Sequence, residues 1–173
     1  KVPSQISVEE AIRNAGRLLK EGEATAVKLE GGHAIAATVE RLVSLGIPVM
    51  GHLGLRPQSV HQMGGFRRQA KRSEEQAALL EDAIALQQAG AFSIVLECIP
   101  TELAREVTGR LSIPTIGIGS GPYCDGQVLV CNDILGLSEG DTPPFVTRYS
   151  NLAEQIVSAA TQFHNEVKGN QFP

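Results

Sequence analysis

The chain has 173 residues, of which 42% are hydrophobic, and is therefore long enough for one domain with a real core. Its net charge of −4 and its 4% content of aromatic residues give no reason to expect nucleic acid as the main partner. No apolar run approaches the roughly 20 residues of a membrane span, and the first five residues lack the apolar stretch of a secretory signal.

Helices alternate with short apolar stretches along the chain. The period of the apolar residues, with capping boxes at Ser7 and Ser73, predicts helices at about 8–19, 35–43, 73–86, 102–110 and 151–167. Short runs rich in β-branched residues predict strands at 24–30, 47–52, 92–97 and 113–119. This alternation is typical of βαβ units and predicts the α/β class with a parallel sheet.

The expected strands end in polar or glycine-rich residues, which suits a closed barrel because the functional loops of a barrel all follow the carboxyl ends of strands. The residues alone leave an open, doubly wound sheet as the alternative. No G-x-G-x-x-G motif opens a helix after a first strand, which counts against a dinucleotide-binding fold. We expect a single domain over residues 1–173, with the glycine run 117–121 as a tight turn rather than a phosphate cradle.

Lys28 and Glu30 lie two residues apart in an expected strand and therefore share one face, while Val27 and Leu29 take the other. In a barrel the two charged side chains would project into the lumen. Charges there are costly unless they are paired, hydrogen-bonded or bound to a metal. One interpretation is a buried Lys–Glu pair; the other is a lysine that receives an anionic substrate beside a carboxylate that supports a cation.

Glu97 and His52 also end expected strands. A carboxylate at the end of an apolar strand is where burial raises a pKa towards values useful to a general base, so Glu97 is a candidate base, with a rim salt bridge or a helix N-terminal anion as the alternative. His52 has no second histidine at metal-ligand spacing, which favours a structural or pocket-lining role over a metal ligand.

A 20-residue connection, 53–72, separates two expected elements and shows little periodicity. Connections of that length in compact domains tend to be functional or disordered. It carries 5 of the 15 Lys and Arg residues, namely Arg56, Arg67, Arg68, Lys71 and Arg72. This basic cluster is a candidate receptor for an anionic substrate, and a solvated loop surface is an equally good interpretation.

The three cysteines, Cys98, Cys124 and Cys131, share no metal-type spacing, which favours reduced thiols in a reducing compartment. Apolar residues flank Cys98 and Cys131, so we expect these two side chains to be buried as small hydrophobes.

Several motifs, in order and in register, resemble ketopantoate hydroxymethyltransferase. They are Lys28-Leu29-Glu30-Gly31-Gly32, Gly51-His52-Leu53-Gly54-Leu55-x-Pro57-Gln58, Val95-Leu96-Glu97-Cys98-Ile99-Pro100, Ile113-Pro114-Thr115-Ile116-Gly117-Ile118-Gly119-x-Gly121 and Asp125-Gly126-Gln127-Val128-Leu129-Val130. The resemblance runs nearly end to end and is highly specific.

The resemblance implies a (β/α)8 TIM-type barrel, of which this chain covers about strands 4 to 8 and the C-terminal helices. It implies transfer of a hydroxymethyl group from the co-substrate 5,10-methylenetetrahydrofolate to 3-methyl-2-oxobutanoate, giving 2-dehydropantoate for pantothenate and coenzyme A synthesis. A Mg2+ ion would chelate the keto acid. By position in the motifs, Glu97 resembles the proton acceptor, Lys28 the substrate-binding lysine and Glu30 the metal-site glutamate.

The same resemblance implies a cytoplasmic enzyme that forms a large, ring-based homo-oligomer such as a decamer. The family's earlier strands carry a Gly-Asp-Ser motif and an Asp-Leu-Pro-type motif, whose aspartates bind the metal and the keto acid, and neither occurs here. We therefore expect an N-terminally truncated chain that by itself binds Mg2+ poorly and has little activity. The alternatives are another Mg2+-dependent α-keto acid lyase on a related barrel, or a non-catalytic remnant used in assembly.

Overall fold

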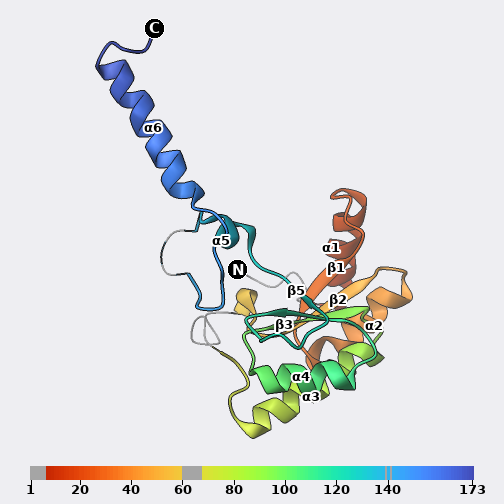
Figure 1. Ribbon diagram of the computed structural model, residues 1–173. Helices are drawn as coiled ribbons and strands as arrows, with labels where there is room; N and C mark the ends of the chain where they lie inside the picture. The colour runs from red at the N-terminus through yellow and green to blue at the C-terminus, as the bar shows by residue number, and fades with distance from the viewer. Residues whose placement is uncertain (1–6, 60–67, 139, 141) are drawn as a thin grey trace. The chain divides into compact units, whose positions relative to one another are not determined.

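A computed structural model describes residues 7–59, 68–138, 140 and 142–173. Its five strands form one parallel sheet in the order β1-β2-β3-β4-β5 (Figure 1). The strands are β1 (Val27–Glu30), β2 (Val49–Gly54), β3 (Ser93–Glu97), β4 (Thr115–Ile118) and β5 (Gly126–Gln127). Neighbours in the sheet are neighbours in the chain, which is the order of a (β/α)8 barrel. The α/β class and the four expected strands are confirmed, in a sheet that stays open over the described residues.

The five expected helices are confirmed, and a short sixth helix was not expected. The expected helices are α1 (Val8–Lys20), α2 (Ala36–Ser44), α3 (Ser73–Gln88), α4 (Thr101–Arg110) and α6 (Leu152–Lys168). The helix that was not expected is α5 (Cys131–Leu135). Two 3-10 turns, η1 (His33–Ile35) and η2 (Pro57–Ser59), follow β1 and β2. The glycine run 117–121 leads to β5 and opens no helix, as expected of a turn.

One of the two predicted capping boxes is wrong by one residue. Ser7 caps α1 as predicted, because its hydroxyl accepts the backbone N–H of Glu10 at 3.1 Å. Ser73, in contrast, is already the first residue of α3, and Arg72 is the N-cap. The Glu75 carboxylate accepts the backbone N–H groups of Arg72 and Lys71, and this interaction sets the start of the helix.

The hydrophobic core lies on the face of the sheet that packs against the helices. Val27 and Leu29 are buried in it, whereas Lys28 is exposed and Glu30 is half-buried, so the predicted alternation along β1 is confirmed. The neighbouring strands and α2, α3 and α4 supply most of the rest of the core, including Leu42, Val49, Leu79, Leu86, Ile94, Leu96 and Val107. Burying each large aliphatic side chain contributes about 1.5–3 kcal/mol, so the sheet is held from this one face.

The chain divides into two compact units, Lys1–Val128 and Leu129–Pro173. The first holds the sheet and α1 to α4. The second holds α5 and α6, with the backbone N–H of Tyr149 donating to the carbonyl of Ile134 at 2.8 Å. A single barrel domain over 1–173 stays a prediction. No helix within the described ranges is long and apolar enough to cross a membrane.

All three cysteines are free thiols. Cys98 and Cys124 are half-buried, and burial is the main cause that raises the pKa of each thiol, so both stay protonated at neutral pH. The prediction that Cys131 is buried is wrong. It is exposed at the start of α5, a helix in which no residue is buried, so its apolar neighbours in the sequence bring it no cover.

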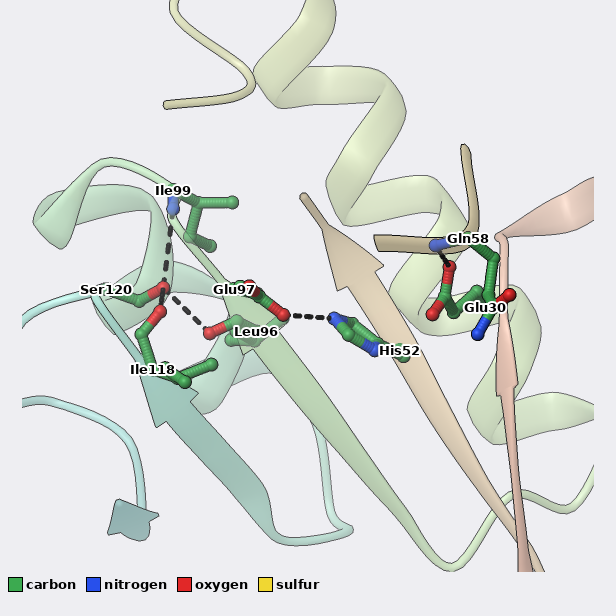
Figure 2. Close-up of polar contacts among 8 residues, drawn as sticks. All are labelled: Glu30, His52, Gln58, Leu96, Glu97, Ile99, Ile118 and Ser120. Carbon is green, nitrogen blue, oxygen red and sulfur yellow. Dashed lines mark hydrogen bonds and ion pairs between the residues drawn. The ribbon is translucent and has the colours of Figure 1, made fainter. Parts of the chain in front are cut away.

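A buried serine holds the carboxyl end of β3. Ser120 is fully buried, and its hydroxyl donates to the carbonyl of Leu96 at 2.8 Å and accepts the N–H of Ile99 at 3.3 Å (Figure 2). These two residues flank Glu97 and Cys98, so one side chain fixes the backbone on both sides of the strand end. Buried backbone groups need such partners because water cannot reach them.

We predict that Ser120→Ala lowers the free energy of unfolding by about 1–3 kcal/mol, because it leaves a buried donor and a buried acceptor without a partner. Urea denaturation of the protein that carries this chain measures the loss. Ser44→Ala is the matched control, since its hydroxyl is exposed and donates only to the Arg41 carbonyl. Equal losses in the two variants would contradict the role of Ser120.

Candidate functional site

Polar side chains gather on the face of the sheet opposite the core. The register pairs Glu30 of β1 with His52 of β2, and Gly54 of β2 with Glu97 of β3. Residues paired in this way point to the same side of a sheet, so Lys28 shares the face with these carboxylates. Figure 2 shows His52 lying between Glu30 and Glu97, each on its own strand. Glu30, His52 and Glu97 therefore lie near one another at the carboxyl ends of their strands, with Lys28 further back on the same face.

His52 contacts the candidate base directly. Its Nε2 lies 3.0 Å from Oε2 of Glu97, with the two side chains 3% and 15% exposed. The two atoms are close but are not aligned as a hydrogen bond, and among the described residues neither ring nitrogen of His52 has a hydrogen-bond partner. A buried polar atom that makes no hydrogen bond, as Nδ1 of His52, costs about 1–3 kcal/mol. Costs of this kind cluster where a site binds or transforms a ligand.

Glu30 is held by the turn that follows β2. Its Oε2 accepts the backbone N–H of Gln58 at 3.1 Å, so η2 folds back across the end of β1 (Figure 2). Lys28, two residues earlier, is exposed. Among the described residues Lys28 and Glu30 are therefore not both buried, and whether the two side chains pair stays a prediction.

Glu30 is the residue that the sequence predicted as a metal ligand. A carboxylate oxygen, as Glu30 presents, is the ligand type that Mg2+ prefers. Within the described ranges no group of three or more His, Cys, Asp or Glu side chains is placed to hold a metal ion. Glu30 thus fits as one ligand of such an ion, and the described part of this chain does not complete the set.

The backbone around Glu97 is in an unusual, tightly packed conformation. The next residue, Cys98, has a positive φ of 53°, which is rare outside glycine. The carbonyl of Glu97 accepts the N–H of Leu55 at 2.8 Å. Gly54 approaches so closely that a Cβ there would overlap the Glu97 carbonyl oxygen, and its φ is +88°. Only glycine fits between the ends of β2 and β3.

The basic cluster predicted in the 53–72 connection is described in part. Arg56, Arg68, Lys71 and Arg72 lie around a cavity beside the ends of β1 and β2. Arg72 forms an ion pair of 2.7 Å with Glu75. Arg67 lies outside the described residues.

Three features of the site were not predicted from the sequence. The His52–Glu97 contact joins residues 45 positions apart, and only the parallel register brings them together. Ser120 stands in a glycine-rich run whose pattern indicates a turn and not a buried hydroxyl. The close approach at Gly54 could have been predicted, because a glycine at the end of a strand often marks a place where two backbones come close together.

We predict that Gly54→Ala displaces Glu97 and lowers both stability and turnover. Gly46→Ala is the matched control, since Gly46 has a similar φ of +80° but nothing within 4 Å of its added Cβ. The positive φ alone costs about 1–2 kcal/mol in either variant, and the overlap at Gly54 should add about 1–3 kcal/mol. Urea denaturation and steady-state kinetics measure the difference, and equal effects in both variants would refute the close-approach argument.

Comparison with known proteins gives one consistent result. A family model described as ketopantoate hydroxymethyltransferase matches residues 2–173. Proteins named 3-methyl-2-oxobutanoate hydroxymethyltransferase from Moorella thermoacetica and Syntrophus aciditrophicus are 56% and 57% identical to the chain over 169 residues. These alignments cover 98% of this chain but 63% and 62% of the relatives, so it spans less than two thirds of their length. The chain belongs to the ketopantoate hydroxymethyltransferase family.

Proposed function

We propose that the protein carrying this chain transfers a hydroxymethyl group from 5,10-methylenetetrahydrofolate to 3-methyl-2-oxobutanoate and so forms 2-dehydropantoate. The observation that carries the proposal is the half-buried Glu97 carboxylate, which lies against His52 on the same sheet face as Glu30 and Lys28. Membership of the family, and relatives that are named as hydroxymethyltransferases, support the type of reaction.

Glu97 is the proposed proton acceptor. The keto acid becomes a carbon nucleophile when the proton on C3 is removed, and the electrons of that C–H bond then form the enolate. Water adds to the methylene carbon of the donor, both C–N bonds of that carbon break, and tetrahydrofolate leaves with its nitrogens protonated. C3 of the enolate then bonds to this carbon, whose oxygen comes from the water and takes up a proton to become the new hydroxyl group. Glu97 suits the first step because its side chain is 15% exposed, so a substrate can reach the carboxylate while bulk water is largely kept away.

His52 and Lys28 are proposed to orient the reacting groups. His52 lies at 3.0 Å from Oε2 of Glu97 and restricts the rotation of that carboxylate. Lys28 is exposed on the same face and is proposed to receive the carboxylate of the keto acid. When bound, Mg2+ would polarise the keto oxygen as a Lewis acid, with Glu30 as the ligand from this chain.

We further propose the setting implied by the family. The protein acts in the cytoplasm as a large, ring-based homo-oligomer, and this chain by itself holds Mg2+ poorly. Three free cysteines fit a reducing compartment. The single carboxylate contributed at Glu30, without a larger group of ligands in the described ranges, supports weak metal binding by the chain alone.

Replacing Glu97 tests the central role. Glu97→Gln keeps the shape of the side chain but removes the base, and turnover should fall at least about a hundredfold. Loss of the C3 proton can be followed separately as deuterium uptake by the keto acid in D2O. Glu102→Gln, an exposed carboxylate on α4, is the control. Near-normal deuterium uptake by Glu97→Gln would assign the base to another residue.

Replacing Lys28 tests keto-acid binding. Lys28→Ala should raise the KM for 3-methyl-2-oxobutanoate by about tenfold or more, the scale of one lost charge-assisted hydrogen bond, with a smaller change in kcat. Lys20→Ala removes an exposed lysine from the end of α1 and should leave both constants unchanged. An unchanged KM in Lys28→Ala would remove the lysine from the site.

A further inference from the structure

A cavity of about 610 Å³ lies within the first unit, beside the carboxyl ends of β1 and β2. Gly31, which lines it, directly follows Glu30, and Gly54, which also lines it, is paired in the sheet with Glu97. Its size falls within the range of about 300–1,000 Å³ that is usual for small-molecule sites. The cavity therefore adjoins the ends of the strands that carry Glu30 and Glu97, although neither side chain lines it.

The described lining of the cavity is apolar at its base and cationic at its edge. Leu53, Ala70 and Leu79 are buried side chains of the lining, and glycines 31, 32 and 54 leave room for close approach to the backbone. Arg56 is half-buried, while Arg68, Lys71 and Arg72 are exposed. Such a lining suits an elongated ligand with an apolar body and an anionic end.

The positive charges of this cavity exceed the negative ones. Four cationic side chains line it against two carboxylates, Glu75 and Asp82. Both carboxylates are already engaged, Glu75 by Arg72 and Asp82 by the backbone N–H of His33 at 2.6 Å. Hydrogen bonds from Arg72 also lower the pKa of Glu75, which keeps it ionised and paired.

The other three cations of the lining take part in none of the ion pairs between described side chains; they are Arg56, Arg68 and Lys71. The keto acid has a single carboxylate, and the proposed partner of that group is Lys28. The surplus of positive charge in the cavity is therefore available to another anion.

We propose that this cavity binds the glutamate tail of the reduced folate donor, an inference that rests on the proposed function. The donor ends in a glutamate with two carboxylates, joined to its pterin ring by an aromatic linker. Guanidinium groups pair with carboxylates through two parallel hydrogen bonds, which makes Arg56 and Arg68 suitable partners. In this arrangement the carboxylates of the tail bind at the cationic edge, and the aromatic linker runs past Gly31 and Gly54, with the one-carbon unit directed towards the ends of β1 to β3.

The test uses the protein that carries this chain and compares donors with one and with three glutamates. Arg68→Ala and Arg56→Ala should each raise the KM for the donor by about tenfold, the scale of one lost charge-assisted hydrogen bond. The increase should be larger for the triglutamate, while the KM for the keto acid stays unchanged. Arg110→Ala is the control, because it removes an equal charge from the exposed end of α4.

An unchanged donor KM in both variants, or an equal increase in Arg110→Ala, would overturn the proposal. An equal increase in the KM for the keto acid would also overturn it, because the arginines would then serve the smaller substrate. Glutarate, a free dicarboxylate, should inhibit competitively against the donor. Inhibition that is not competitive would instead identify a separate anion site and count against a tail site.

Equilibrium dialysis with tetrahydrofolate distinguishes this inference from the proposed function. If the unaltered protein transfers no hydroxymethyl group, the proposed function fails, yet dialysis still reports on the cavity. Weaker tetrahydrofolate binding by Arg68→Ala than by Arg110→Ala supports the tail site in either case. Equal binding by the two variants overturns it.

Discussion

The backbone N–H of Leu55 donates to the carbonyl of Glu97 at 2.8 Å, and the position of the candidate base depends on this bond. It closes the ends of β2 and β3 against each other, and only a glycine at position 54 leaves room for it. The hydroxyl of Ser120 holds the same strand end from the side of β4. Glu97 is thus anchored through its backbone, which leaves its carboxylate directed towards His52 and the open face of the sheet.

The two faces of the sheet contribute differently to the stability of the fold. The outer face is covered by helices and buries Val27, Leu29 and their neighbours, which supplies most of the stability. The inner face keeps His52 almost fully buried with neither ring nitrogen in an aligned hydrogen bond among the described residues. Ser93 on the same face carries a hydroxyl in the same condition. Among the described residues, the buried side-chain atoms without a hydrogen bond lie on this inner face, which makes it the candidate functional face.

Positively charged side chains lie at two separate places near the strand ends. Lys28 lies on the inner face, and the cations around the cavity lie beside the loops that follow β1 and β2. Two anionic ligands bound close together repel each other unless each is paired with a cation. Under the proposed function, each anionic substrate would have its own cation, with the reacting carbon atoms between Glu30 and Glu97.

The sequence by itself determined the α/β class, the strands and helices, and the common face of Lys28 and Glu30, because these follow from local periodicity and from the alternation of side chains along a strand. Its motifs also identified the family. Only the tertiary structure decided that His52 contacts Glu97, that Gly54 and Ser120 hold the end of β3, and that arginines surround a cavity beside it. These contacts join residues more than 20 positions apart in the chain. They depend on strand register and loop packing, which local sequence patterns do not encode.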